Sequence, residues 1–232
     1  MSVLSFNSLV ICNGDHDLSS LAETLKYFSS IGIRKFIITF DVDLVVSSEF
    51  DILNDYKAFK KSVKSIKPFG VKLLITPNVH LSQGVAKNPF LKKLTIPNTD
   101  IIFIQTPLFV DGTWLNPDLN YLMYKQKLRP VFTCFERNLI SCKYEISNQL
   151  YKTQGVIFCI DINYMTSISA ESRIRQGLER NINIVPSISN DLLTYYTSLN
   201  KFSRLSERLS KSTYSRFCMY LMKNTRSLFN DL

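Results

Sequence analysis

Lys35-Phe36-Ile37-Ile38-Thr39-Phe40 is an apolar run of strand length in which only Lys35 and Thr39 are polar. A nearly continuous apolar run is typical of a parallel strand that is buried on both faces. Apolar residues recur at helical spacing on both sides of it, over residues 18–28 and then at Phe50, Leu53, Tyr56, Phe59, Val63 and Ile66. The region therefore predicts a helix, a buried strand and a second helix in succession.

The same alternation of strand and helix continues along the chain. Further strands are predicted over residues 8–12, 71–76, 100–105, 130–134, 155–161 and 181–186. Repeated strand–helix units favour an α/β fold, and seven of them favour a distorted seven-stranded (βα)7 TIM-like barrel over a doubly wound open sheet. We expect a single domain over residues 1–232, with a barrel core at about 8–190 and C-terminal helices over 191–232.

Composition and charge narrow the class of protein. The formal net charge of +9 over 232 residues predicts either an anionic partner or a basic surface without a specific role. The five cysteines are odd in number and form no C-x-x-C pair, which indicates free thiols. We find no signal-peptide pattern and no apolar run long enough to span a membrane, so we expect a cytoplasmic location.

A functional site of such a barrel is expected at the C-terminal ends of its strands. The residues predicted there are Cys12, Asp41, Asn78, Gln105, Cys134, Asp161 and Ser187. A cluster of hard divalent ions needs several carboxylates and imidazoles, whereas the chain has only two histidines, His16 and His80. Asp41 and Cys134, with His16, are the candidates for a single ion. Alternatively, these residues are a loop cap, a packed thiol and part of a polar loop.

Several segments resemble one known family. Residues 119–137, with Lys127-Leu-Arg-Pro-Val131 and Cys134-Phe-Glu-Arg137, are similar to a "G-Y-x-P-V-L-A-H-P-E-R-Y" motif. Gly32 to Thr39 resembles that family's second strand and the turn before it. The family is that of the bacterial PHP-type (polymerase-and-histidinol-phosphatase) protein-tyrosine phosphatases of capsule and exopolysaccharide loci, the CpsB/CapC/YwqE-like proteins. The resemblance covers residues 8–231 and implies a PHP-type barrel, which in this family holds a manganese cluster.

The family's metal-ligand positions are changed in this chain. Its opening "D-x-H-x-H" has no counterpart, and its bridging glutamate falls at Asn78. The motif "T-P-H-H" is Thr39-Phe40-Asp41-Val42, the histidine of "H-P-E-R" is Cys134, and the closing "S-D-x-H" is Ser187-Ile188-Ser189-Asn190. The resemblance therefore implies that Ile188 and Asn190 lie at the barrel mouth together with Asp41, Asn78 and Cys134. Only Asp41 and Cys134 keep any capacity to donate to a metal. The sequence therefore predicts that the manganese cofactor is not retained.

A retained scaffold with altered ligands predicts a non-catalytic pseudophosphatase that binds or regulates a protein. The resemblance implies a role in capsule or exopolysaccharide production or in tyrosine-kinase control. It also implies a tyrosine kinase, or its phosphorylated tail, as the partner. The alternative is a weak or altered metal-dependent phosphoesterase or protein-tyrosine phosphatase with a reduced site at Asp41 and Cys134. The sequence leaves the oligomeric state open.

Two further expectations concern the rim and the interior of the barrel mouth. Glu136 and Arg137 match the family's motif, and Arg137 either binds a phosphoryl group or forms a local ion pair with Glu136. If the mouth is no longer a metal site, Phe40, Phe135, Cys12 and Cys134 are expected to fill part of it.

Overall fold

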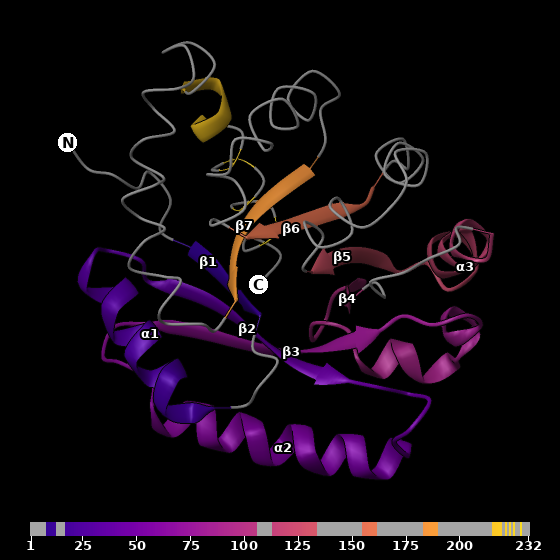
Figure 1. The fold of residues 1–232 in the computed structure, drawn as a ribbon, viewed down its shortest axis with the longest axis horizontal. Helices are drawn as coiled ribbons and strands as arrows, with labels where there is room; N and C mark the ends of the chain where they lie inside the picture. Colours follow the sequence, from indigo (N-terminus) through magenta and orange to yellow (C-terminus); the bar gives the residue numbers. More distant parts are fainter. Residues whose placement is uncertain are drawn as a thin grey trace.

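The computed structural model describes residues 8–12, 17–105, 113–133, 155–161, 183–189 and 215–219, together with residues 221, 223, 225 and 228. Within these residues, seven strands form one closed barrel in chain order, and all neighbours are parallel (Figure 1). The strands are β1 (Ser8–Cys12), β2 (Lys35–Val42), β3 (Lys72–His80), β4 (Ile101–Gln105), β5 (Arg129–Thr133), β6 (Ile157–Asp161) and β7 (Asn183–Ser189). The predicted α/β barrel is thereby confirmed, and the open sheet is excluded.

Side chains alternate along each strand between the inside and the outside of the barrel. An inner apolar cluster contains Val10, Ile37, Ile96, Ile101, Phe103, Val131, Ile157, Cys159, Val185 and Leu228. The intervening positions, such as Phe36, Ile38 and Phe158, belong to a larger outer cluster that also contains the helix residues. Because both faces of the strands are buried, the strands read in the sequence as continuous apolar runs.

Helix α1 (Leu18–Ser30) begins where the sequence predicts it. The Asp17 carboxylate accepts hydrogen bonds from the backbone N–H groups of Ser19 (3.0 Å) and Ser20 (3.3 Å), as a helix N-cap does. Gly32 follows the helix with a φ of 104°, a backbone conformation that favours glycine. The helix buries Leu21, Leu25 and Phe28 against the barrel.

Helix α2 (Glu49–Ser65) lies along the outside of β2 and β3 (Figure 1). It buries Ile52, Phe59 and Val63, whereas Phe50 and Leu53 of the predicted apolar stripe are exposed, Phe50 to 74%. The prediction was wrong at these two positions because Ile52, not Phe50 or Leu53, shares a helix face with Phe59 and Val63.

Phe40 packs under α2 and does not fill the barrel mouth. Its ring centroid lies 5.1 Å from that of Phe59 and 5.9 Å from that of Tyr56. Strand alternation turns Phe40 outward because its neighbours Thr39 and Asp41 face the barrel interior. The expectation that Phe40 fills the mouth was therefore wrong, and Phe135 lies outside the described residues.

Strand β3 is longer than predicted. It continues past Thr76 to His80, so that Asn78 lies within the strand. Pro77 does not end it, because β3 pairs with β4 only from Asn78 onward and Pro77 precedes that ladder. This extension carries two polar side chains, Asn78 and His80, into the C-terminal end of the barrel.

The remaining described elements cover the barrel. Two 3-10 turns (Val85–Lys87 and Pro89–Lys93) connect β3 to β4, and α3 (Leu115–Asn120) continues into a π-helical stretch (Tyr121–Lys125) before β5. Near the C-terminus, Phe217 and Leu221 are buried in the outer cluster and Leu228 in the inner one. No helix among the described residues is both long and apolar enough to cross a bilayer.

Candidate functional site

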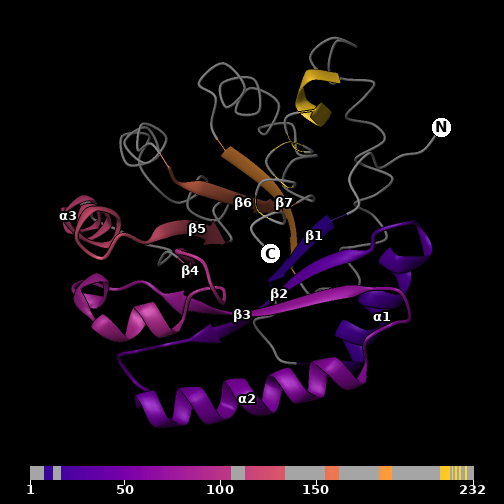
Figure 2. The same ribbon diagram turned by 180° about the vertical axis from the view of Figure 1, so that it is seen from behind.

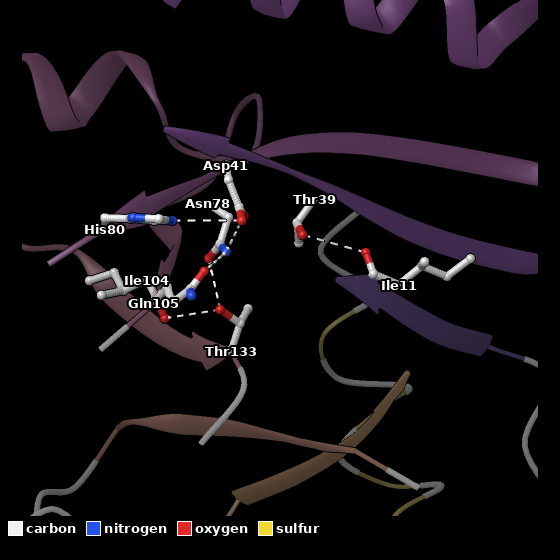
Figure 3. A network of polar contacts seen from close by, with 8 residues as sticks. All are labelled: Ile11, Thr39, Asp41, Asn78, His80, Ile104, Gln105 and Thr133. Atoms are coloured by element: carbon white, nitrogen blue, oxygen red, sulfur yellow. Dashed lines mark hydrogen bonds and ion pairs between the residues drawn. The ribbon is translucent and has the colours of Figure 1, made fainter. Parts of the chain in front are cut away.

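Polar side chains from four neighbouring strands meet at the C-terminal end of the barrel interior (Figure 3). Asn78 of β3 is fully buried and lies at their centre. Its Nδ2 donates hydrogen bonds to Asp41 Oδ1 of β2 (2.7 Å) and to Gln105 Oε1 of β4 (3.2 Å). Its Oδ1 accepts one from Thr133 Oγ1 of β5 (2.9 Å). Asn78 thus joins all four strands through its amide group.

Strand register brings these residues together, and charge decides how the amide is oriented. Asp41 is the register partner of Asn78, and Gln105 is the partner of Thr133. A carboxylate only accepts hydrogen bonds. Turning the amide over would place its oxygen against Asp41 Oδ1 at a separation of 2.7 Å, where the two oxygens repel each other. The amide N–H therefore points at Asp41.

His80 lies beside the same carboxylate, two residues after Asn78 on the inner face of β3. Its Nε2 is 3.6 Å from Asp41 Oδ2, and the His80 side chain is 43% exposed whereas that of Asp41 is 20% exposed. The nearby Asp41 carboxylate raises the pKa of His80 above its ordinary value of 6.5, and partial burial opposes the rise. Asp41 therefore sits between a buried amide and a half-exposed imidazole.

The raised pKa of His80 predicts a pH dependence with a definite sign. Because the folded-state pKa lies above 6.5, the ion pair stabilises the fold fully below that pH and is lost as the pH rises through the folded pKa. We expect Asp41→Asn to lower the pKa of His80, because the carboxylate that contributes most to the rise is removed while partial burial still opposes it. NMR titration of the imidazole protons measures this, and His80→Gln identifies the signal. Equal midpoints in wild type and Asp41→Asn would contradict the assignment.

Further polar residues lie on the other side of the mouth. Asp161 ends β6 and is the register partner of Ser187 in β7. The two residues are 7% and 2% exposed, and Asp161 is two positions beyond Cys159 of the inner cluster. The barrel interior is therefore apolar in its N-terminal half and polar at its C-terminal end.

The structure brings the predicted site residues Asp41 and Asn78 together, whereas it places Ile188 on the outside of the barrel. Asp41 and Asn78 are hydrogen-bonded, as described above. Ile188 was expected at the mouth, but it is 2% exposed and belongs to the outer cluster. Alternation along β7 turns Ser187 inward and Ile188 outward, which corrects that expectation. The following predicted residues lie outside the part of the chain that the structure describes: His16, Cys134, Glu136, Arg137 and Asn190.

Two members of the network were not predicted from the sequence. Thr133 is not among the residues predicted at the strand ends, and His80 lies beyond the strand predicted over residues 71–76. The sequence contains a signal for His80, because side chains two residues apart lie on the same face of a strand. Asn78 and His80 therefore share one face once β3 is extended. For β5, Val131 is in the inner cluster, so Thr133 is the next residue to face inward.

The described donors do not fit a cluster of metal ions. No three side chains of the His, Cys, Asp and Glu types come together among the described residues. Asp41 and His80 can donate to a cation, but Asn78 presents N–H hydrogens to Asp41, where a cation would need oxygen atoms. The manganese cluster implied by the sequence resemblance therefore has no matching ligand set in this part of the chain.

Comparisons with known proteins support the fold. No family model and no curated protein matches the chain. A crystal structure from work on YwqE of Bacillus subtilis and CpsB of Streptococcus pneumoniae, which are metal-dependent tyrosine phosphatases, aligns with a TM-score of 0.60 and 18% identity. The alignment covers 90% of this chain and 88% of that one. An uncharacterised B. cereus protein aligns with a TM-score of 0.42, 11% identity and coverage of 90% of this chain and 66% of that one. The chain therefore shares the fold of that structure, an α/β TIM-like barrel, which here is closed by seven parallel strands.

Proposed function

We propose that this chain is a PHP-fold pseudophosphatase, which uses the barrel to bind or regulate a protein and does not hold a catalytic metal cluster. The observation that carries the proposal is the orientation of the Asn78 amide. The resemblance aligns Asn78 with a glutamate that bridges metal ions. A bridging carboxylate offers negative oxygens to two cations, whereas the Asn78 Nδ2 group offers its hydrogens to Asp41 and Gln105.

The proposed partner is a protein with an acidic, tyrosine-phosphorylated segment, such as the tail of a tyrosine kinase. Two observations support this class of ligand. The structure that aligns with a TM-score of 0.60 comes from work on tyrosine phosphatases, and the chain carries a net charge of +9, which attracts phosphorylated segments. We place this binding in the cytoplasm, in the control of capsule or exopolysaccharide production.

A second candidate is supported by the pair formed by Asp41 and His80. A carboxylate 3.6 Å from a half-exposed imidazole is an arrangement that acid–base enzymes use. In this reading the chain is an altered phosphoesterase with a reduced site at Asp41 and Cys134. This enzyme would depend on fewer metal ions than the family's cluster, because no three metal-donor side chains come together among the described residues.

Metal content and turnover distinguish the two candidates. The protein is purified without chelators, its bound transition metals are measured, and hydrolysis of an aryl phosphate is assayed with added Mn²⁺. We expect the purified protein to contain far less than one metal ion per chain. We also expect it to hydrolyse the aryl phosphate at the same rate as the Asp41→Ala variant. Stoichiometric metal, together with turnover that Asp41→Ala and Cys134→Ala abolish, would establish the phosphoesterase instead.

Binding provides the positive test of the pseudophosphatase. The ligands are one acidic, tyrosine-rich peptide in phosphorylated and unphosphorylated forms, compared by fluorescence anisotropy. We expect the phosphorylated form to bind about tenfold more tightly, because a phosphoryl group forms charge-assisted hydrogen bonds, and to be recovered intact. Arg137→Ala should remove the difference, and Lys92→Ala, an exposed control, should keep it. Equal affinity for the two forms would rule out phosphotyrosine recognition.

A further inference from the structure

The outward side of α2 and the two loops that adjoin it carry large apolar side chains that nothing among the described residues covers. Phe50 is 74% exposed and Leu53 is 42% exposed. Val46, in the loop before the helix, is 79% exposed, and Phe69, in the loop after it, is fully exposed. Figures 1 and 2, which view the molecule from opposite sides, both draw α2 at its margin with no described element beyond it. Large exposed apolar residues gathered around one element indicate an interaction surface.

Lysines share this side of the helix. An α-helix turns about 100° per residue, so Lys57 and Lys61 lie within about 20° of Phe50 around the helix axis. Lys64 lies within about 40° of it. All three lysines are exposed, and only Lys64 is in the last turn, where the helix dipole favours a cation. The helix dipole therefore does not account for Lys57 and Lys61.

The acidic residues of α2 point away from this side. Glu49 and Asp51 lie about 100° from Phe50 around the helix axis, and Asp55 lies about 140° from it. The Glu49 carboxylate is also 3.8 Å from Lys93 Nζ, which offsets its charge. The side of α2 that faces outward is therefore both cationic and apolar, without an acidic residue among the lysines.

We propose that this side of α2 binds the surface of an anionic phospholipid bilayer. Its residues, which we call the α2 face, are Phe50, Leu53, Lys57, Lys61 and Lys64, with Phe69 in the loop beyond the helix. The lysine ammonium groups contact lipid phosphates while their alkyl stems lie along apolar surface. Phe50 and Phe69, at opposite ends of a helix about 25 Å long, enter the boundary between headgroups and acyl chains. The helix then lies in the plane of the membrane, with Ile52, Phe59 and Val63 still buried against the barrel.

A bilayer fits the α2 face better than other anionic partners do. A nucleic acid would contact the lysines but leave the aliphatic side chains of Val46 and Leu53 in water. A peptide that adds a strand needs a free sheet edge, and the closed barrel offers none. A helical peptide needs a groove, whereas the α2 face is the outer side of a single helix. A bilayer offers phosphate groups and hydrocarbon together, and it contacts a helix along its whole length.

The number of contacts predicts weak and reversible binding. Each lysine close to an anionic bilayer surface strengthens binding about fivefold. Salt screens this attraction but leaves the apolar contacts of Phe50 and Phe69 in place. We therefore expect the affinity for anionic vesicles to fall steeply with rising salt concentration. The net charge of +9 adds a general attraction, from which the contribution of the α2 face must be separated.

Sedimentation with vesicles tests the proposal on the full chain. One set of vesicles contains phosphatidylcholine alone, and the other contains equal parts of phosphatidylcholine and phosphatidylglycerol. The wild type should sediment with the mixed vesicles and stay in solution with the neutral ones. Lys57→Glu with Lys61→Glu should weaken binding to the mixed vesicles at least about 25-fold, because two attractive charges are removed and two repulsive ones are added.

A matched charge variant separates the α2 face from the general attraction. Lys125→Glu with Lys127→Glu changes the net charge by the same amount at exposed positions just before β5, across the barrel from α2. This variant should bind the mixed vesicles within about threefold of the wild type. Urea unfolding of both double variants checks that each is folded, as expected for substitutions at exposed residues. Equal weakening by the two double variants would overturn the proposal, because general charge would then explain the binding.

The apolar contacts have their own test. Phe50→Ser with Phe69→Ser should weaken binding to the mixed vesicles at least about tenfold, since it removes the side chains that enter the bilayer. In Phe50→Trp, the mixed vesicles should shift the emission of the new tryptophan to shorter wavelength. The wild type, whose only tryptophan is Trp114, provides the reference spectrum.

Three results would overturn the proposal. The first is a wild type that does not sediment with the mixed vesicles. The second is a Phe50→Ser, Phe69→Ser variant that binds them as the wild type does, together with unchanged emission from Phe50→Trp. The third is a polyglutamate peptide or a single-stranded oligonucleotide that binds the α2 face when vesicles do not, which would assign the face to a protein or a nucleic acid. None of these variants alters the barrel mouth, so each of these results would leave the proposed pseudophosphatase standing.

Discussion

Asn78→Ala is expected to lower the free energy of unfolding by about 3 kcal/mol. The Asn78 side chain is fully buried and makes three hydrogen bonds to side chains on β2, β4 and β5. Its removal leaves a void and takes away the 2.7 Å donor of the Asp41 carboxylate. A buried charge that loses a hydrogen-bond partner costs more than a neutral group does. Urea unfolding followed by circular dichroism measures the difference.

Thr133→Val provides the matched control for this variant. Valine has nearly the shape of threonine, so it removes only the 2.9 Å hydrogen bond to Asn78 Oδ1 and leaves no void. The expected loss is about 1 kcal/mol, and the Asp41 contact stays intact. If Asn78→Ala cost no more than Thr133→Val, the amide would not be the centre of the polar network.

The barrel could be predicted because its strands are buried on both faces. Phe36, Ile37 and Ile38 alternate between the outer and inner clusters, yet all three are apolar, and so the run is visible in the sequence. The length of β3 could not be read in the same way. Beyond Thr76 its residues alternate between polar side chains facing the mouth and apolar ones facing outward, and Pro77 resembles a strand end.

The composition of the site was predictable, but its contacts were not. The positions of Asp41, Asn78 and Gln105 at strand ends follow from the order of the strands. That Asn78 donates to both of the others depends on the register between β2, β3 and β4, which is set by the packing of whole strands. Which side of a strand a residue faces also depends on register, and for this reason Phe40 and Ile188 were placed on the wrong side.

Asn78→Asp is expected to give the largest effect, and one that depends on pH. The change keeps the shape of the side chain but places a second carboxyl group where Nδ2 now lies, 2.7 Å from Asp41 Oδ1. Two carboxylates at this distance cannot both be ionised in a buried site, so the fold raises the pKa of the introduced group. Unfolded aspartate has a pKa of about 3.9, and therefore the folded state of the variant binds an extra proton above that pH.

Because the folded variant binds this extra proton, its stability falls as the pH rises. Relative to wild type, the variant should be only slightly destabilised near pH 4 and should lose about 1.4 kcal/mol for each further pH unit, until the raised pKa is reached. At pH 7 the loss should be about 3 to 5 kcal/mol, as for an unpaired buried charge. Urea unfolding at a series of pH values measures the slope for both proteins.

The double variant Asp41→Asn with Asn78→Asp is the control, because it exchanges the carboxylate and the amide and keeps a single charge in the pair. It should lose the steep pH dependence, since an amide N–H again faces a lone carboxylate. A flat difference between Asn78→Asp and wild type would show that the mouth already accommodates two neighbouring carboxylates. The barrel end would then be able to carry the paired acidic ligands that a cation requires, and the main support for a pseudophosphatase would be lost.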